Sequence, residues 1–434
     1  MFGYYLDLAL RSLRRNKILT ALMVVAIALG IGASMTTLTV LHVLSGDPLP
    51  GSSQTLFYPQ VDPRDMDGYE EGKRPPEQIT WTDGMNLLHA KRADRQALMT
   101  GGAVPVQPTQ SNIDPFFSDA RYTSSDFFPM FQVPFLYGRP WTEAEDNSRA
   151  RVVVISRKLN EKLFGGKDST GQTLRMKDTA FQVIGVLDAW KPVPRFYDLN
   201  MESYGDVEDV FVPLTTSRDV HFGHSGNTDC WGTGGGDDEH AETSPCVWLQ
   251  FWVQLDGAAK VAAYHDFLVH YSQEQKTLGR FQRPVNVELP GLMEWMDINK
   301  VVPGDVRLQT WLALGFLLVC LVNTVGLMLA KFLRRAGELG VRRALGASKR
   351  EVFMQLLVES GVIGLAGGVC GLLLAFVGLW LVRKQPSDYA ALAHMSMGML
   401  ALTFLLAVGT TLLAGLLPAW RACQITPALQ LKSQ

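Results

Sequence analysis

Four long stretches of the chain contain no Asp, Glu, Lys or Arg and consist mainly of apolar residues. They cover residues 18–46, 308–330, 360–382 and 395–420. Each exceeds the roughly 20 residues that an α-helix needs to cross the hydrocarbon core of a bilayer. Together with flanking residues, they predict four transmembrane helices at 18–46, 306–333, 351–384 and 395–421.

The first apolar run is expected to be an anchor that is not cleaved. The apolar region of a signal peptide has about 7–15 residues and is followed by small residues at the cleavage site. Here the run is nearly twice as long, and Ser45-Gly46-Asp47-Pro48 follows it without that pattern. We expect residues 1–17 to form an amphipathic helix on the inner leaflet, a plain topology signal being the alternative.

A short basic turn joins the second and third predicted helices. Residues 331–350 contain seven Lys or Arg and a single acid, Glu338, so the turn is expected to face the cytoplasm. Gly346 suits a left-handed residue that ends a helix, and Ser348 with Glu351 suits the capping box of the next helix. The segment 334–350 therefore predicts a compact helix joined rigidly to two spans. An ordinary positive-inside loop is the alternative, although such a loop needs only charge and no defined shape.

Small residues in the spans predict close helix packing. They are Gly30 in the first span and Gly364, Gly367, Gly368 and Gly371 in the third. Glu359 lies near the inner end of the third span, where we expect it to reach the interface. Because transporters of polar solutes usually place charges at mid-membrane, the uncharged runs argue against a polar pathway through these helices.

The segment between the first and second spans is acidic, and the rest of the chain is basic. Residues 45–306 contain 24 Lys or Arg and 37 Asp or Glu. An acidic domain of this size does not suggest nucleic-acid binding. The charge distribution places residues 47–305 outside, together with a short loop at 385–394. It places the N-terminus and the tail 422–434 inside.

Residues 47–305 predict an α+β domain made of two subdomains. Residues 82–99 look helical, and a strand, helix and strand follow one another at 247–289. These would form a first subdomain from 47–115 plus 245–305, with 116–244 as an inserted second subdomain. The fold class predicted is thus a four-helix membrane protein with a large extracytoplasmic α+β domain.

Two cysteines lie in the outer domain, Cys230 and Cys246. In an oxidising compartment such a pair is expected to form a disulfide. A metal site is the alternative, because histidines and acids lie near them in sequence, although the spacing does not match zinc motifs. Those neighbours are His221, His224, Asp237, Asp238, Glu239 and His240.

Catalytic motifs are missing from the sequence. There is no G-x-S-x-G, H-E-x-x-H or C-x-x-C pattern. Gly165-Gly166-Lys167 lacks the earlier glycine and the following Ser or Thr of a phosphate-binding loop. We therefore expect a non-catalytic protein that needs no metal or cofactor of its own.

Several motifs, taken together, resemble the MacB/FtsX-type ABC transporter permeases. The membrane motifs lie at 8–17, 26–31, 323–328, 338–347, 355–359, 418–422 and 427–429. In the outer domain, residues 152–156, 163–166, Gly171 and 183–186 resemble the MacB-like periplasmic core domain. One departure is Arg334, which stands where the family commonly has a glutamate, so a family ion pair is not assumed there.

The resemblance implies a permease of the bacterial inner membrane with a periplasmic outer domain and cytoplasmic termini. It implies a dimer, or a pair with a sister permease, and two copies of a separate ATPase that binds ATP and magnesium. ATP hydrolysis would drive movement of the outer domains, called mechanotransmission. The residues expected to contact the ATPase are Leu339, Arg342, Arg343, Leu345, Gly346 and Arg350.

The resemblance leaves three functions open. Efflux of peptides, toxins or antibiotics is favoured, with membrane lipid, a periplasmic adaptor and a TolC-like outer-membrane channel as further partners. Release of lipoproteins and FtsX-like control of a cell-wall hydrolase are the alternatives. A cell-surface enzyme is the alternative from a different class, and the missing catalytic motifs weigh against it.

Overall fold

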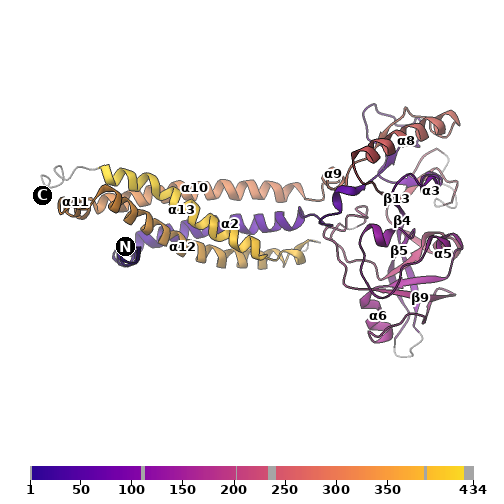
Figure 1. The fold of residues 1–434 in the computed structure, drawn as a ribbon, viewed down its shortest axis with the longest axis horizontal. Coiled ribbons are helices and arrows are strands. Elements are labelled where there is room, and N and C mark those ends of the chain that lie inside the picture. The colour runs from indigo at the N-terminus through magenta and orange to yellow at the C-terminus, as the bar shows by residue number, and fades with distance from the viewer. Residues whose placement is uncertain (1, 109–112, 202, 233–240, 386–388, 425–434) are drawn as a thin grey trace. The chain divides into compact units, whose positions relative to one another are not determined.

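A computed structural model of the chain describes residues 2–108, 113–201, 203–232, 241–385 and 389–424. The chain divides into two compact units (Figure 1). The helical unit comprises Met1–Ser45 and Val302–Gln434, and the α+β unit comprises Gly46–Val301. Each unit is described by itself below.

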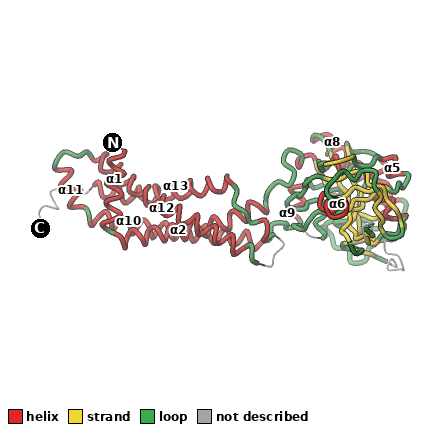
Figure 2. The backbone as a smooth tube through the Cα atoms, turned by 90° about the horizontal axis from the view of Figure 1, so that it is seen from below, coloured by secondary structure: helices red, strands yellow, loops and turns green. Residues whose placement is uncertain are grey.

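Long helices dominate the helical unit (Figure 2). Its elements are α1 (Phe2–Arg15), α2 (Lys17–Leu44), α10 (Gly304–Arg334), α11 (Ala336–Ala344), α12 (Lys349–Val382), the 3₁₀ turn η2 (Ala390–Leu392) and α13 (Met397–Gln424). Among the described residues, α2, α10, α12 and α13 are long and apolar enough to cross a membrane. The four predicted spans are therefore confirmed, with ends that differ by only a few residues.

Small residues allow the long helices to approach one another closely. A Cβ added to Gly367 of α12 would lie 2.6 Å from Cγ2 of Ile27 in α2. One added to Gly364 would lie 1.9 Å from Oγ1 of Thr411 in α13. The other glycines expected to pack make similar approaches: Gly30 to Leu317, Gly368 to Ala407 and Gly371 to Ile31.

One sheet forms the centre of the α+β unit. Within the described residues it has twelve strands, with the main order β1-β13-β4-β5-β10-β7-β9-β6. Their bounds are β1 (Leu56–Phe57), β3 (Ile79–Thr80), β4 (Arg95–Gln107), β5 (Phe116–Thr123), β6 (Phe135–Gly138), β7 (Val152–Ile155), β8 (Thr173–Met176), β9 (Thr179–Leu187), β10 (Val210–Pro213), β11 (Gly223–Ser225), β12 (Asp229–Cys230) and β13 (Cys246–Gln254). A two-stranded sheet pairs β2 (Gln60–Val61) with β14 (Val287–Glu288).

Helices flank these strands. They are α3 (Trp81–Ala90), α4 (Phe127–Met130), α5 (Glu143–Asn147), α6 (Arg157–Phe164), α7 (Leu214–Asp219), α8 (Ala258–Thr277) and α9 (Leu292–Ile298), with the 3₁₀ turn η1 (Ser53–Thr55) near the start of the unit. The predicted division at residue 115 falls between β4 and β5, which pair antiparallel from Met99–Thr123 to Val106–Phe116. The two predicted subdomains thus share one continuous sheet.

Residues 95–99 are strand rather than helix, which corrects the predicted helix at 82–99. Lys91 follows α3 in the left-handed conformation, with φ of 48°, and β4 begins at Arg95. Residues 97–99 are buried and pair with β13, and Met99 also pairs with β5. Sheet pairing and burial therefore outweigh the local helix propensity of this stretch.

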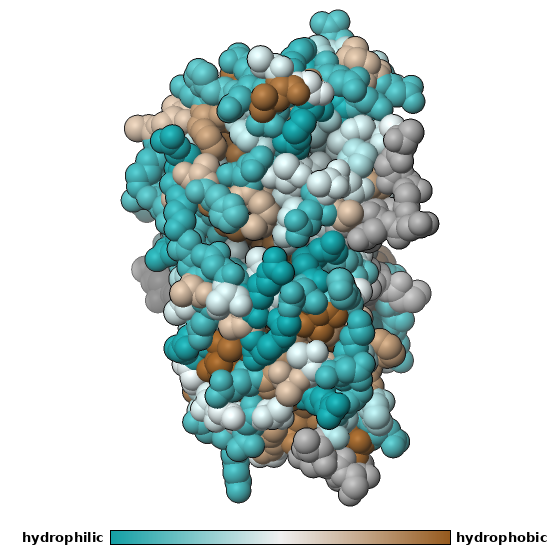
Figure 3. Space-filling view, turned by 90° about the vertical axis from the view of Figure 1, so that its right-hand side faces the viewer, coloured by the Kyte–Doolittle hydropathy of each residue, from teal (hydrophilic) through white to brown (hydrophobic). Residues whose placement is uncertain are grey.

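The two units expose different kinds of surface. The face of the α+β unit drawn in Figure 3 is mainly hydrophilic, with small separate hydrophobic patches. Large apolar side chains are exposed along the spans, among them Trp311, Leu318 and Leu405 at 73%, 62% and 71%. The first surface suits water and the second suits lipid or another apolar helix.

Candidate functional site

The turn between α10 and α12 is a short helix with defined ends. The N–H of Ala347 donates to the carbonyl of Arg342 at 3.1 Å, and that of Gly346 to the carbonyl of Arg343 at 3.2 Å. This is the Schellman pattern, and Gly346 has the positive φ, 105°, that it requires. Ser348 and Glu351 then form a reciprocal capping box at the start of α12. Both predicted helix signals are confirmed.

One face of α11 packs onto the bundle. Leu339 is 5% exposed and belongs to the apolar core that α2, α10, α12 and α13 share. It was expected to contact a partner, but in this chain it points inward and holds α11 against the spans. The spacing of apolar residues along this short helix did not reveal which of its faces is buried.

The remaining residues expected to contact a partner lie at the surface or bind neighbouring helices. Leu345 is 84% exposed, and Gly346 and Arg350 are also exposed. Arg342 and Arg343 are half-buried. The first donates to Oε1 of Gln355 in α12 and the second to the carbonyl of Cys423 in α13, both at 3.1 Å. These bonds tie α11 to two spans.

A buried ion cluster lies beneath α11. Nζ of Lys331 in α10 is 2.7 Å from Oε1 of Glu359 in α12, and both side chains are almost fully buried. Nη1 of Arg335 lies 3.1 Å from Oε2 of the same carboxylate and 2.6 Å from Oγ of Ser12 in α1. The Ser12 hydroxyl also bonds to Glu359. This cluster connects α1, α10 and α12.

The burial of Glu359 corrects the expectation that it reaches the membrane interface. The residue is 1% exposed, because Lys331 and Arg335 neutralise it inside the bundle. Charges at the inner ends of two consecutive spans were the available signal for this pair. Breaking a buried ion pair by removing one partner is strongly destabilising, whereas the pair itself adds little.

A second ionic contact joins α1 to α11. Glu338 pairs with Arg15 and with Arg335, whose Nε lies 3.3 Å from its Oε2. Burial raises the pKa of the Glu338 carboxyl, but hydrogen bonds from Arg15 and Arg335 outweigh it and hold the pKa below its ordinary value. Arg334, the departure from the family pattern, is exposed. Its neighbour Arg335 makes the ionic contacts here, to Glu338 and Glu359.

In the α+β unit, Cys230 and Cys246 form a disulfide between β12 and β13. His224 lies against Trp248, with ring centroids 4.6 Å apart, and its Nε2 is 3.2 Å from Nη1 of Arg218. Residues 237–240, which belong to the alternative metal site, lie outside the described residues. Among the described residues there is no group of three or more potential metal ligands.

Comparison with known families covers most of the chain. Residues 20–268 match the MacB-like periplasmic core domain, and residues 311–427 match the FtsX-like permease C-terminal domain. The first match contains most of α2 and all strands of the twelve-stranded sheet. The second contains α11 with the spans on either side of it.

Curated relatives match at low identity over most of this chain. The pyoverdine export ATP-binding/permease protein PvdT of Pseudomonas aeruginosa is 24% identical over 374 residues, which are 85% of this chain and 50% of PvdT. The macrolide export ATP-binding/permease proteins MacB of Hyphomonas neptunium and Escherichia coli K12 are each 26% identical over 98% of this chain and 60% of their own length. The chain thus spans half to three fifths of these relatives.

Among solved structures, one match is the periplasmic region of MacB from Actinobacillus actinomycetemcomitans. It is 13% identical with a TM-score of 0.36 and covers 59% of this chain and 96% of that region. The extracellular domain of the transporter YknZ is 14% identical with a TM-score of 0.35, covering 54% of this chain and all of that domain. The first family match alone covers more than half of this chain, and the chain belongs to the MacB/FtsX-type ABC transporter permeases.

Proposed function

We propose that the chain is the permease of an ABC exporter and that α11 is the surface on which the ATPase acts. The observation that carries this proposal is the construction of α11. It is a helix with defined caps, held by Leu339 inside and by Arg342 and Arg343 on α12 and α13, with Leu345 left exposed at its end. A plain topology signal needs none of these contacts.

The charge pattern supports the orientation that this role needs. Residues 331–350 contain seven basic residues and one acid, a pattern that favours the cytoplasmic side of the membrane for α11. The α+β unit is then periplasmic, and both termini are cytoplasmic. ATP and magnesium would be bound by the ATPase rather than by the residues described here.

The contacts beneath α11 provide a route for movement. A displacement of α11 is passed to α10 through Arg335 and to α12 through Glu359, because the cluster with Lys331 holds these helices together. The central parts of the spans carry no charged residue, so movement of helices, rather than passage of a polar solute between them, is the mechanism favoured. Movement of the periplasmic unit then drives export.

The relatives suggest the substrates and partners of such an exporter. Two of them are named for export of pyoverdine and of macrolides, so a medium-sized organic molecule or peptide is the proposed cargo. A second permease copy or a sister permease completes the membrane part. A periplasmic adaptor and a TolC-like channel would carry the cargo onward.

The proposal is tested by ATP hydrolysis in lipid nanodiscs that contain the full chain and the ATP-binding subunit that copurifies with it. Leu345→Asp should abolish the stimulation of hydrolysis by the permease, because it places a charge on the exposed end of α11. Leu278→Asp, at a residue of the α+β unit that is 67% exposed, is the matched control and should leave stimulation intact. Normal stimulation by Leu345→Asp, or the lack of any copurifying ATP-binding subunit, would overturn the proposal.

A further inference from the structure

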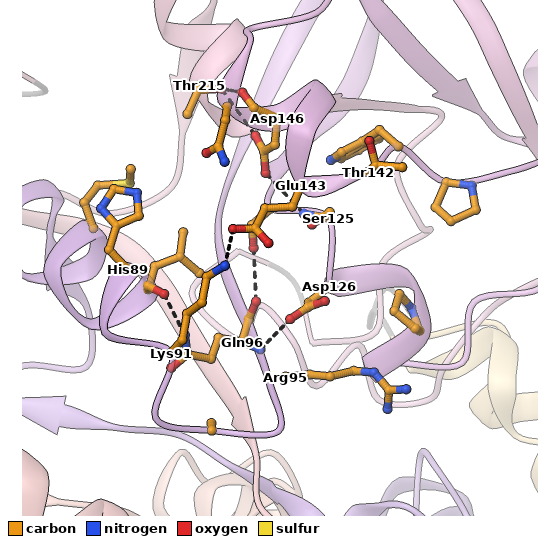
Figure 4. Close-up of a pocket in the computed structure, with 18 of the residues that line it drawn as sticks. His89, Lys91, Arg95, Gln96, Ser125, Asp126, Thr142, Glu143, Asp146 and Thr215 are labelled. Carbon is orange, nitrogen blue, oxygen red and sulfur yellow. Dashed lines mark hydrogen bonds and ion pairs between the residues drawn. The ribbon is translucent and has the colours of Figure 1, made fainter.

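A polar cavity of about 370 Å³ lies within the α+β unit (Figure 4). Side chains from α3, the start of β4, the segment 124–126, α5 and α7 line it. None of the interactions proposed for α11 involves these residues. The volume is within the range of small-molecule sites, about 300–1,000 Å³.

The most buried charge in this cavity is the carboxylate of Asp146, on α5. The residue is 7% exposed. One oxygen accepts from the backbone N–H of Ser125 at 3.2 Å, and the other accepts from the hydroxyl of Thr215 at 3.3 Å (Figure 4). Neither donor carries a charge, and no ion pair to Asp146 exists among the described residues. Burial without a cation raises the pKa of this carboxyl to about 7.

A second carboxylate, Asp126, also lacks a cationic partner among the described residues. Its Oδ2 accepts from the backbone N–H of Gln96 at 3.0 Å (Figure 4). The other acids of the lining are already neutralised, Glu143 by Lys91 at 2.5 Å and Asp94 by Lys260 outside the cavity. The remaining base of the lining, Arg95, is exposed and donates to Oε1 of Gln254 at 2.9 Å. Among the described residues, no base is therefore bonded to Asp126 or Asp146.

Two buried polar atoms of the lining have no hydrogen-bond partner among the described residues. They are the indole Nε1 of Trp141, a residue 2% exposed, and Oε1 of Gln96, a residue 4% exposed. Buried polar groups are nearly always paired, and an unpaired one is costly. Both residues line the cavity, beside the apolar side chains of Met85, Leu88, Pro129 and Pro140.

We propose that this cavity binds a small organic amine in its protonated form, with the ammonium group at Asp146 and the organic part against Trp141 and Leu88. An ammonium ion supplies the missing positive charge and a hydrogen bond to a carboxylate that is otherwise buried without a cation. A polar group on the same molecule can pair with Trp141 Nε1 or Gln96 Oε1.

The lining argues against other ligand classes. Two unpaired carboxylates repel an anion. A divalent metal usually takes at least three protein ligands, and the described residues contain no such group. Apolar side chains beside the carboxylates are typical of a site for an organic molecule.

Binding of an amine in this cavity does not depend on the proposed coupling to an ATPase, so it is tested without the ATPase. Calorimetric titration of the full chain in lipid nanodiscs at pH 8 uses tyramine, with tyrosol as a neutral match in which a hydroxyl replaces the ammonium group. Tyramine should bind at least about 10-fold more tightly than tyrosol. Equal binding of the two, or no binding of tyramine at millimolar concentration, would overturn the proposal. Loss of coupling at α11 would leave this result unchanged.

Two variants locate the site. Asp146→Asn should lower the affinity for tyramine at least about 10-fold and leave tyrosol unaffected, because it removes only the charge. Ala93→Leu adds bulk to the half-buried lining residue Ala93 and should weaken both ligands. Asp178→Asn, at an exposed acid elsewhere in the unit, is the control and should change neither affinity. Unchanged tyramine binding in either cavity variant would contradict the assignment.

Discussion

The ammonium group of Lys331 lies 2.7 Å from the carboxylate of Glu359, and both side chains are shielded from solvent inside the helical unit. The two residues belong to consecutive spans, α10 and α12, which α11 separates in sequence. Arg335, at the joint between α10 and α11, contacts the same carboxylate. The pair therefore couples the position of α11 to both spans.

Removal of the charge of Glu359 should strongly destabilise the helical unit. Glu359→Gln leaves Lys331 buried without a counter-charge, a situation that costs about 3–5 kcal/mol in other proteins. The additional change Lys331→Met should restore part of this loss. Thermal unfolding of the full chain in detergent measures both effects. The single variant Lys331→Met completes the comparison. If the stability loss of the double variant equals the sum of the losses of the two single variants, the pair is not coupled.

The cap of α11 should depend on Gly346. Gly346→Ala forces a side chain into a left-handed conformation with φ of 105°, at a cost of about 1 kcal/mol. We expect frayed helix ends and weaker stimulation of ATP hydrolysis. Gly337→Ala, inside α11 where an added Cβ meets no atom within 4 Å, is the matched control and should retain full stimulation. If both variants behave alike, the cap has no role in coupling.

The stability of the α+β unit should depend on pH through Asp146. Burial raises the pKa of this carboxyl from 3.8 to about 7, against the opposing hydrogen bonds from Thr215 and Ser125. Because the folded chain binds this proton more tightly than the unfolded chain, the stabilisation is complete below about pH 4 and is lost as the pH rises through 7.

Asp146→Asn should therefore stabilise the chain at pH 8 by roughly 2–4 kcal/mol and change little at pH 4. An amide can accept from the Ser125 N–H and donate to the Thr215 hydroxyl, so the local bonds survive. Unfolding followed by tryptophan fluorescence at the two pH values measures the difference, with Asp178→Asn as the control. An equal effect at both pH values would contradict this account.

The disulfide between Cys230 and Cys246 should protect two of the five cysteines from alkylation. In denatured, unreduced protein, maleimide should label three thiols, those of Cys320, Cys370 and Cys423. Reduction should raise the number to five. Mass spectrometry counts the labels, and five labels before reduction would refute the bond.

Local signals in the sequence were enough for the membrane architecture and for the ends of α11. Uncharged runs fix the spans because hydrocarbon excludes charge, and Gly346 with Ser348 and Glu351 fixes the caps because a few neighbouring residues satisfy them. These features depend on contacts close in sequence.

Features that depend on distant contacts were missed. Residues 95–99 pair with β13 and, at Met99, also with β5. Glu359 is buried against Lys331 and Arg335. The environment of Asp146 combines α5 with Ser125 and Thr215. The charges at the inner ends of α10 and α12 were a signal for the pair of Lys331 and Glu359. The other partners cannot be assigned from residue type or period alone.

The central claim is that the exposed end of α11 contacts an ATP-binding subunit. A photo-crosslinking amino acid at position 345 of the full chain, expressed in cells with its native partners, tests this contact directly, and position 278 is the control. We predict that irradiation joins position 345 to an ATP-binding protein, identified by mass spectrometry, while position 278 gives no such product. An adduct with lipid alone at position 345, or the same protein captured from both positions, would contradict the account.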